Sequence, residues 1–101
     1  MSDELFRIQT GQFKRDPELV RAELVDALQQ YAEIFREKAA MEFSRAEAVE
    51  LIADKIKAGG AADAGDIQQG QAFARAYGLL EMRFNEMKMR CDRLILEHGN
   101  N

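Results

Sequence analysis

A stripe of apolar side chains repeats near the C-terminal end of the chain at alternating intervals of four and three residues. An average spacing of about 3.5 residues, kept over successive heptads, is typical of helices that pack side by side along their length. The stripe therefore predicts one long helix and a second helical segment that covers it. The residues of the stripe that we expect in the core are Phe73, Tyr77, Leu80, Phe84, Met87, Cys91 and Leu94, and His98 continues the series.

Start and stop signals for a helix lie on both sides of the stripe. Asp66 is followed three residues later by Gln69, which resembles a capping box, and Gly99 is suited to end a helix. Several glycines and alanines precede Asp66. We therefore expect a glycine loop at residues 59–65 and a helix at residues 67–98, nearly 50 Å long at about 1.5 Å per residue.

A second helical segment begins at Asp16. Asp16 is a good N-cap, Pro17 suits the first helical position, and Gly59 is a natural residue to follow the end of the segment. Apolar residues then recur at helical spacing and predict one inward face. The expected core residues on this face are Leu24, Leu28, Tyr31 and Phe35.

The middle of this segment has two interpretations. Ser44 and Glu47 match a capping box, which favours separate helices at about 17–42 and 45–58. The apolar series nevertheless runs through residues 43–45 without a change of phase, and neither Gly nor Pro is present there. One continuous helix is therefore the equal alternative.

These elements define an all-α fold with coiled-coil-like packing. Residues 16–98 form a single helical domain, which is either a long antiparallel helical hairpin or a three-helix bundle, depending on residues 43–45. Residues 1–15 are expected to form an ordered but irregular N-terminal arm, since a lone strand would have no partner within the chain.

A second apolar row accompanies the stripe on the last helix, at intervals of three and seven residues. Two rows make a wide apolar face, which one neighbouring helix does not cover. The cover comes either from a broken first segment, from a second subunit or from another protein. Methionine is unbranched and suits both core gaps and adaptable contact surfaces. The candidate interface residues in this row are Leu79, Met82, Met89 and Leu96.

Acidic residues form a stripe on the first helical segment, and the net charge of −4 argues against a large nucleic-acid footprint. The stripe either pairs with Arg83, Arg90 and Arg93 on the last helix or serves as an electrostatic surface for a basic partner. Its members, which are also candidate interface residues, are Glu23, Asp26, Glu33 and Glu37.

Catalytic, cofactor and metal sites are not expected. The single histidine, His98, lies at a helix end, and Cys91 falls on the apolar stripe, where a thiol is buried and inert. A zinc site needs three or four converging ligands, and neither a Glu-x-x-His pair nor a phosphate-binding glycine motif occurs.

The sequence thus favours a non-enzymatic protein-binding module, such as an adaptor, an assembly or secretion chaperone, or a stoichiometric inhibitor. We expect a homodimer without cofactors, located in the cytoplasm because the chain has one cysteine, no signal-peptide pattern and no long apolar run. Direct contact with nucleic acid or membrane is not expected. The alternatives are a small or phage-type inhibitor of a host nucleoprotein machine and a helical structural subunit of a larger assembly.

Overall fold

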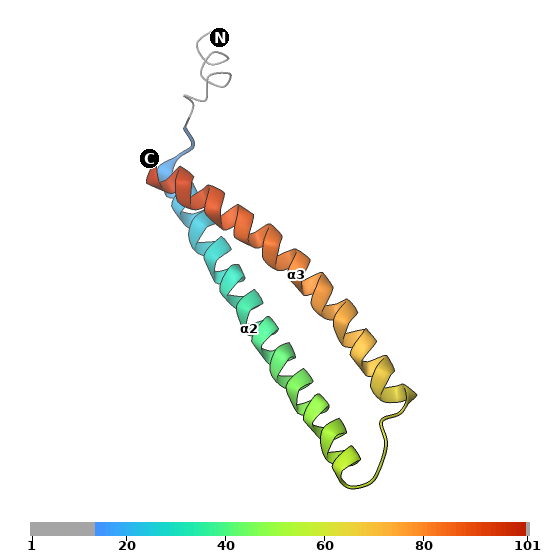
Figure 1. Cartoon of the computed structure of the whole chain (residues 1–101). Coiled ribbons are helices and arrows are strands. Elements are labelled where there is room, and N and C mark those ends of the chain that lie inside the picture. The colour runs from blue at the N-terminus through green and yellow to red at the C-terminus, as the bar shows by residue number, and fades with distance from the viewer. Residues whose placement is uncertain (1–13, 101) are drawn as a thin grey trace.

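The structure, a computed structural model, describes residues 14–100. It contains two long helices, α2 at Pro17–Lys57 and α3 at Ala64–Gly99, packed as an antiparallel hairpin with no strand in the described part of the chain. Figure 1 shows the start of α2 and the end of α3 at the same end of the hairpin. Residues 1–13 of the predicted arm lie outside the described residues.

The ends of α2 are set by the expected local signals. The Asp16 carboxylate accepts a hydrogen bond from the backbone N–H of Glu18 at 3.0 Å, and Pro17 occupies the first helical position. Gly59, just after the helix, has a φ of 92°, which other residues adopt at a cost.

Between these ends α2 is uninterrupted, so that of the two alternatives left open at residues 43–45 the continuous helix and the helical hairpin are the ones observed, and the break and the three-helix bundle are not. The capping box suggested by Ser44 and Glu47 does not stop the helix, because no Gly or Pro there weakens its backbone hydrogen bonds.

The start of α3 differs from the prediction by three residues. Asp63, not Asp66, is the N-cap: its carboxylate accepts from the N–H of Asp66 at 3.1 Å, and the Asp66 carboxylate accepts from the N–H of Asp63 at 2.9 Å. Asp66 also pairs with Lys55 of α2 at 2.8 Å, and this ammonium group lowers the pKa of the Asp66 carboxyl. The reciprocal cap and the ion pair together fix the loop end of the hairpin.

On α3, the predicted stripe faces α2. Leu80, Cys91 and Leu94 are buried, Met87 packs against them, and Phe84 is half-buried. Phe73 and Tyr77, which also belong to the stripe, are half-buried and stack on each other with ring centroids 5.4 Å apart.

On α2, the prediction of the inner face is only partly correct. Leu24 and Tyr31 pack against the core as expected, whereas Leu28 and Phe35 are 41% and 50% exposed. The expectation that Leu28 is a core residue of this hairpin is therefore wrong. Phe35 is a core residue only in part, because one side of its ring packs against Phe84 of α3, with ring centroids 5.1 Å apart, and the other side is exposed. At about 100° per residue, Leu28 and Phe35 each lie four positions beyond a residue of the inner row, which places them on the flank of the helix. The buried residues of α2 are Val20, Ala27 and Ile34.

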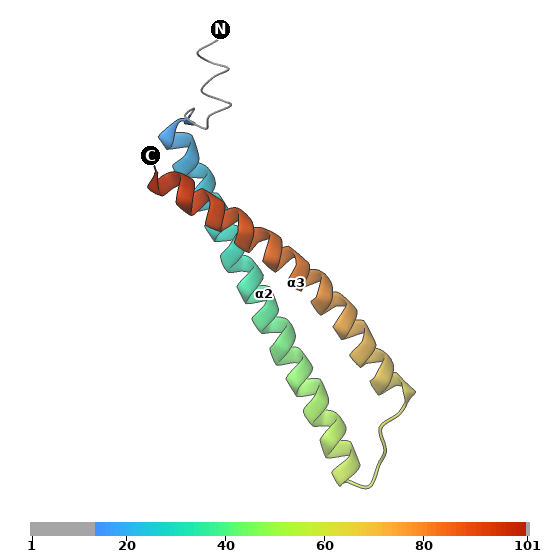
Figure 2. The ribbon, with the colours of Figure 1, turned by 45° about the horizontal axis from the view of Figure 1, so that its top comes forward.

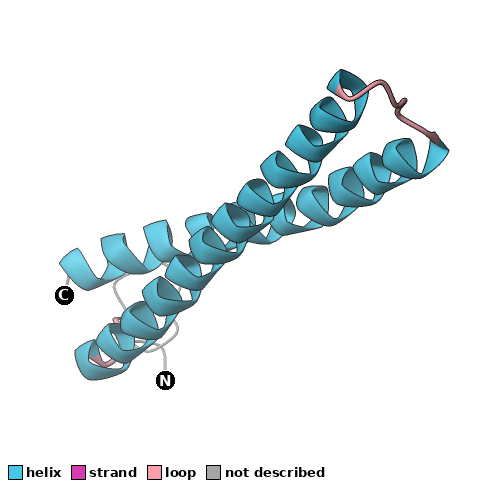
Figure 3. Cartoon of the chain, turned by 90° about the horizontal axis from the view of Figure 1, so that it is seen from below, coloured by secondary structure: helices cyan, strands magenta, loops and turns pink. Residues whose placement is uncertain are grey.

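The inner row of α2 becomes polar toward the loop. Lys38 and Arg45 continue it, and the Lys38 ammonium lies 4.3 Å from the centre of the Phe84 ring and 2.9 Å from the Glu81 carboxylate. No buried residue occurs beyond Ile34 in α2 or before Leu80 in α3 among the described residues. Figures 1 and 2 show the helices closer together at the end that holds the termini than at the loop, and Figure 3 shows that they cross.

Candidate protein-interaction surface

The second apolar row of α3, called here the α3 outer row, is open to solvent. Its members are 60–68% exposed. Each follows a stripe residue by two positions, which corresponds to about 200° around the helix. The row therefore faces away from α2. It lies on the face of α3 opposite the stripe, and not beside the stripe as the sequence suggests. The α3 outer row consists of Leu79, Met82, Met89 and Leu96.

Charged residues interrupt the α3 outer row. Glu86 and Arg93 are exposed and fall between its members, so that the intervals from Leu79 to Leu96 become three and four residues throughout. The outward side of α3 therefore offers separated apolar side chains with charges of both signs between them. This composition resembles the mixed apolar and polar surface of a non-obligate protein interface.

The acidic stripe of α2 has partners within the chain. Glu37 pairs with Arg83 of α3 at 3.1 Å, and Glu33 pairs with Arg36 of the same helix at 2.6 Å. Asp26 accepts a hydrogen bond from the amide of Gln30 at 2.7 Å. Cross-helix pairing, one of the two predicted roles of the stripe, is thus present for Arg83.

The other two predicted arginine partners do not join this pairing, since neither Arg90 nor Arg93 forms an ion pair with the stripe in the part of the chain that the structure describes. These exposed ion pairs also reduce the negative charge that the stripe presents to another molecule.

Arg15 connects the two ends of the described chain. Its guanidinium bonds to Glu23 at 2.9 Å and to Glu97 through Nε at 2.7 Å, and Lys14 donates to the backbone oxygen of Asn100 at 3.0 Å. The positive charge of Arg15 lowers the pKa of the Glu97 carboxyl, while the two carboxylates raise the pKa of Arg15. The first residues before α2 are therefore tied to the last turn of α3.

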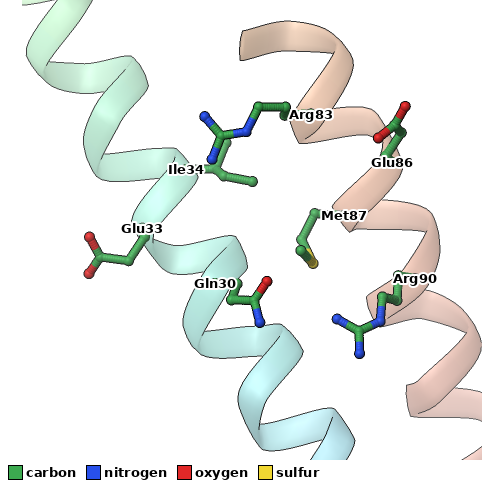
Figure 4. Close-up of a pocket in the computed structure, with 7 residues that line it drawn as sticks. All are labelled: Gln30, Glu33, Ile34, Arg83, Glu86, Met87 and Arg90. Atoms are coloured by element: carbon green, nitrogen blue, oxygen red, sulfur yellow. The ribbon is translucent and has the colours of Figure 1, made fainter.

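A groove of about 390 Å³ runs between the helices on the side of the acidic stripe (Figure 4). Ile34 and Met87 supply its apolar part, and Arg83 and Arg90 border it from α3. Glu33 points away from α3 in this view. The groove thus combines an apolar floor with arginine and glutamate side chains at its edges.

A second groove, of about 480 Å³, lies on the opposite side of the hairpin near the loop. Ala46 and Val49 of α2 and the rings of Phe73 and Tyr77 of α3 line it. At its edge, the Tyr77 hydroxyl donates a hydrogen bond to Glu42, and the nearby carboxylates raise the pKa of Tyr77. This apolar groove was not predicted. The recurrence of alanine at every seventh position from Ala32 to Ala53 is the signal that indicates it.

The thiol and the imidazole of the chain, Cys91 and His98, both lie on α3. Cys91 is 1% exposed, and burial raises the pKa of its thiol, which keeps it in the unreactive protonated form. His98 lies in the last turn of α3. Within residues 14–100, no group of three or more His, Cys, Asp or Glu side chains is arranged to hold a metal ion. Neither described helix contains a segment long and apolar enough to cross a membrane.

No protein-family model, curated protein or solved structure matches this chain. The fold and the surfaces described above therefore carry the functional interpretation.

Proposed function

We propose that this protein is a non-enzymatic protein-binding module that acts by contact, in the manner of an adaptor, an assembly or secretion chaperone, or a stoichiometric inhibitor. The observation that carries the proposal is the exposure of the α3 outer row, between 60% and 68% at each member. Large apolar side chains gathered on one exposed surface mark an interaction site more often than scattered ones do.

The methionines in the α3 outer row favour a partner that docks along a helix. Met82 and Met89 are separated by two helical turns, and their unbranched thioether side chains adapt to an uneven surface. The charges of Glu86, which lies between these methionines, and of Arg93, which lies between Met89 and Leu96, would set the orientation of the partner. We place the complex in the cytoplasm, where a single unpaired cysteine such as Cys91 stays reduced.

The acidic stripe has a secondary role in this proposal. Because Glu23, Glu33 and Glu37 have arginine partners, the stripe contributes to the rate of association with a basic partner more than to affinity. An inhibitor of a nucleoprotein machine and a structural subunit of a larger assembly remain alternative predictions. Both would also act through surface contacts.

The experiment is affinity capture with matched variants. The full chain is compared with Met82→Glu/Met89→Glu, which adds two charges to the α3 outer row, and with Gln29→Glu/Ala40→Glu, which adds two charges at exposed positions of α2. We expect a protein identified by mass spectrometry to be lost with the first variant and retained with the second. A partner that both variants retain would refute the assignment of the α3 outer row. Circular dichroism checks that every variant stays helical.

A further inference from the structure

A second heptad row of apolar residues runs along α2 beside the apolar groove, and we call it the α2 flank. Its large members are between 41% and 53% exposed; these are Leu28, Phe35, Val49 and Ile56. Its small members alternate with them and fall at every seventh position; these are Ala32, Ala39, Ala46 and Ala53. The pattern is that of a packed helical seam, yet its large side chains stay about half exposed in the described chain, with the Phe35 ring touching Phe84 of α3 on one side only.

The α2 flank is distinct from the α3 outer row and from the inner row of α2. Residues of the flank lie about 100° around α2 from the buried residues Ala27 and Ile34. A helix with two apolar rows about 90–100° apart contacts two neighbours at once, as each helix of a four-helix bundle does. One neighbour of α2 is α3. Residues 14–100 of a single chain provide no second neighbour.

The order of large and small residues in the α2 flank fits an antiparallel copy of the same helix. A two-fold axis crossing α2 between residues 40 and 41 would place Leu28 against Ala53 of the second copy, and Phe35 against Ala46 of the second copy. Val49 would likewise lie against Ala32, so that three kinds of layer join one large apolar side chain to one methyl group, whereas Ile56 would lie against Val25. The large–small layers let the helices approach closely while filling the space between them. Symmetric contacts of this kind are the usual route to dimers.

The apolar groove provides a specific receptor in this arrangement. Ala46 belongs both to the α2 flank and to the lining of the groove, which also contains the rings of Phe73 and Tyr77. The Phe35 side chain of the second copy would therefore enter a groove of about 480 Å³ lined by two aromatic rings. Aromatic rings in such pockets contribute strongly to binding.

The dimensions of the α2 flank are those of a weak, reversible contact. From Leu28 to Ile56 the flank is about 42 Å long, and a strip about 10 Å wide on each of two copies gives roughly 850 Å², below the lower bound of about 1,000 Å² for stable specific interfaces. Flanking side chains would add to this area. Glu42, the one carboxylate in the row, would face Ala39 of the second copy, and it accepts a hydrogen bond from the Tyr77 hydroxyl of its own chain.

We infer that a second copy of this chain covers the α2 flank, so that two hairpins form an antiparallel four-helix dimer with Phe35 of each copy seated in the apolar groove of the other. The α3 outer row points away from α2 and remains open in this dimer. The inference therefore goes beyond the proposed function, and its test changes residues of the α2 flank instead of the α3 outer row.

The test is sedimentation velocity of the full chain over a dilution series. We expect a reversible dimer for the wild type. Ala39→Glu/Ala46→Glu would bury unpaired charges at the two-fold contact, raising the dimer dissociation constant by about 100-fold or more. Both alanines are exposed in the single hairpin, so the variant keeps its helical circular dichroism. Met82→Glu/Met89→Glu is the matched control and should stay dimeric.

Three outcomes would overturn the inference: a monomeric wild type at every concentration, a dimer that survives Ala39→Glu/Ala46→Glu, or a dimer that the Met82→Glu/Met89→Glu control dissociates. Phe35→Ala gives a second measure, since it empties the groove without adding charge and should weaken dimerisation by about 10-fold or more. Loss of a captured partner with an intact dimer would implicate the α3 outer row alone, which separates this test from that of the proposed function.

Discussion

Ile34→Ala should lower the free energy of unfolding by about 2–3 kcal/mol, because Ile34 is the buried residue at the centre of the hairpin. Its side chain is 3% exposed. The substitution removes three carbon atoms at about 0.8 kcal/mol each, or about 2.4 kcal/mol of transfer free energy. Ile34 also borders the groove of about 390 Å³ between the helices, so the space that it vacates joins an open groove. The cavity contribution is therefore small, and the loss stays near the lower end of the usual range of about 2–5 kcal/mol.

Urea unfolding followed by far-ultraviolet circular dichroism measures this loss. With a denaturant dependence of about 1–3 kcal/mol per molar urea, the midpoint should fall by roughly 1–2 M. Leu79→Ala is the control, since Leu79 is 65% exposed and its truncation should change stability by no more than about 0.5 kcal/mol. Both proteins are measured at the same concentration, because association would add to apparent stability. Equal losses in the two variants would refute the assigned packing of α2 against α3.

Two further predictions concern the backbone and an ion pair. Gly78→Ala should raise the free energy of unfolding by about 0.5–1 kcal/mol, because Gly78 lies within α3 and nothing outside the helix's own backbone comes within 4 Å of an added methyl group. Gly59→Ala should lower the free energy of unfolding by about 1–2 kcal/mol, because φ is 92° at Gly59. Thermal unfolding should therefore show a higher midpoint temperature for Gly78→Ala and a lower one for Gly59→Ala. The hydrogen bond from Arg15 lowers the pKa of the Glu97 carboxyl, so the ionised carboxylate stabilises the fold at neutral pH. This stabilisation is lost as the pH falls from 4.5, the ordinary pKa of the carboxyl, through its lowered pKa in the folded protein. Glu97→Gln should therefore reduce the stability difference between neutral and acidic pH, and an unchanged difference in urea unfolding would contradict the Arg15 pairing.

Much of the hairpin follows from local signals in the sequence. Asp16, Pro17 and Gly59 act at the ends of α2 as expected, and the 3.5-residue stripe places Leu80, Cys91 and Leu94 against α2. The sequence predicts the start of α3 three residues too late because Asp63 and Asp66 both carry carboxylates that can cap a helix. Only the three-dimensional arrangement shows that Asp63 precedes the helix and that Asp66 completes the box.

The inner face of α2 was harder to predict because α2 has two competing apolar rows. Leu24 and Tyr31 belong to the row that packs on α3, and Leu28 and Phe35 belong to the flank. Both rows keep heptad spacing, so periodicity alone does not select one of them. Choosing between them requires the position of α3, which depends on contacts between residues far apart in the sequence.

Toward the loop, the row of α2 that packs on α3 is more polar than the α2 flank. Lys38 and Arg45 reach into the seam between the helices because their aliphatic stems pack on the aromatic rings of α3 while their charges stay near water. The corresponding stretch of the α2 flank carries Ala39, Ala46 and Val49, with Glu42 between them. Toward the loop the hairpin thus packs Lys38 and Arg45 internally beside Met41, Ala48 and Ile52, and it leaves a mostly apolar row outside. A chain whose stability depended only on its own core would favour the reverse choice, since burial of Val49 and its neighbours stabilises more than burial of Lys38. The observed choice follows if the apolar row is buried in a later step, when two hairpins meet.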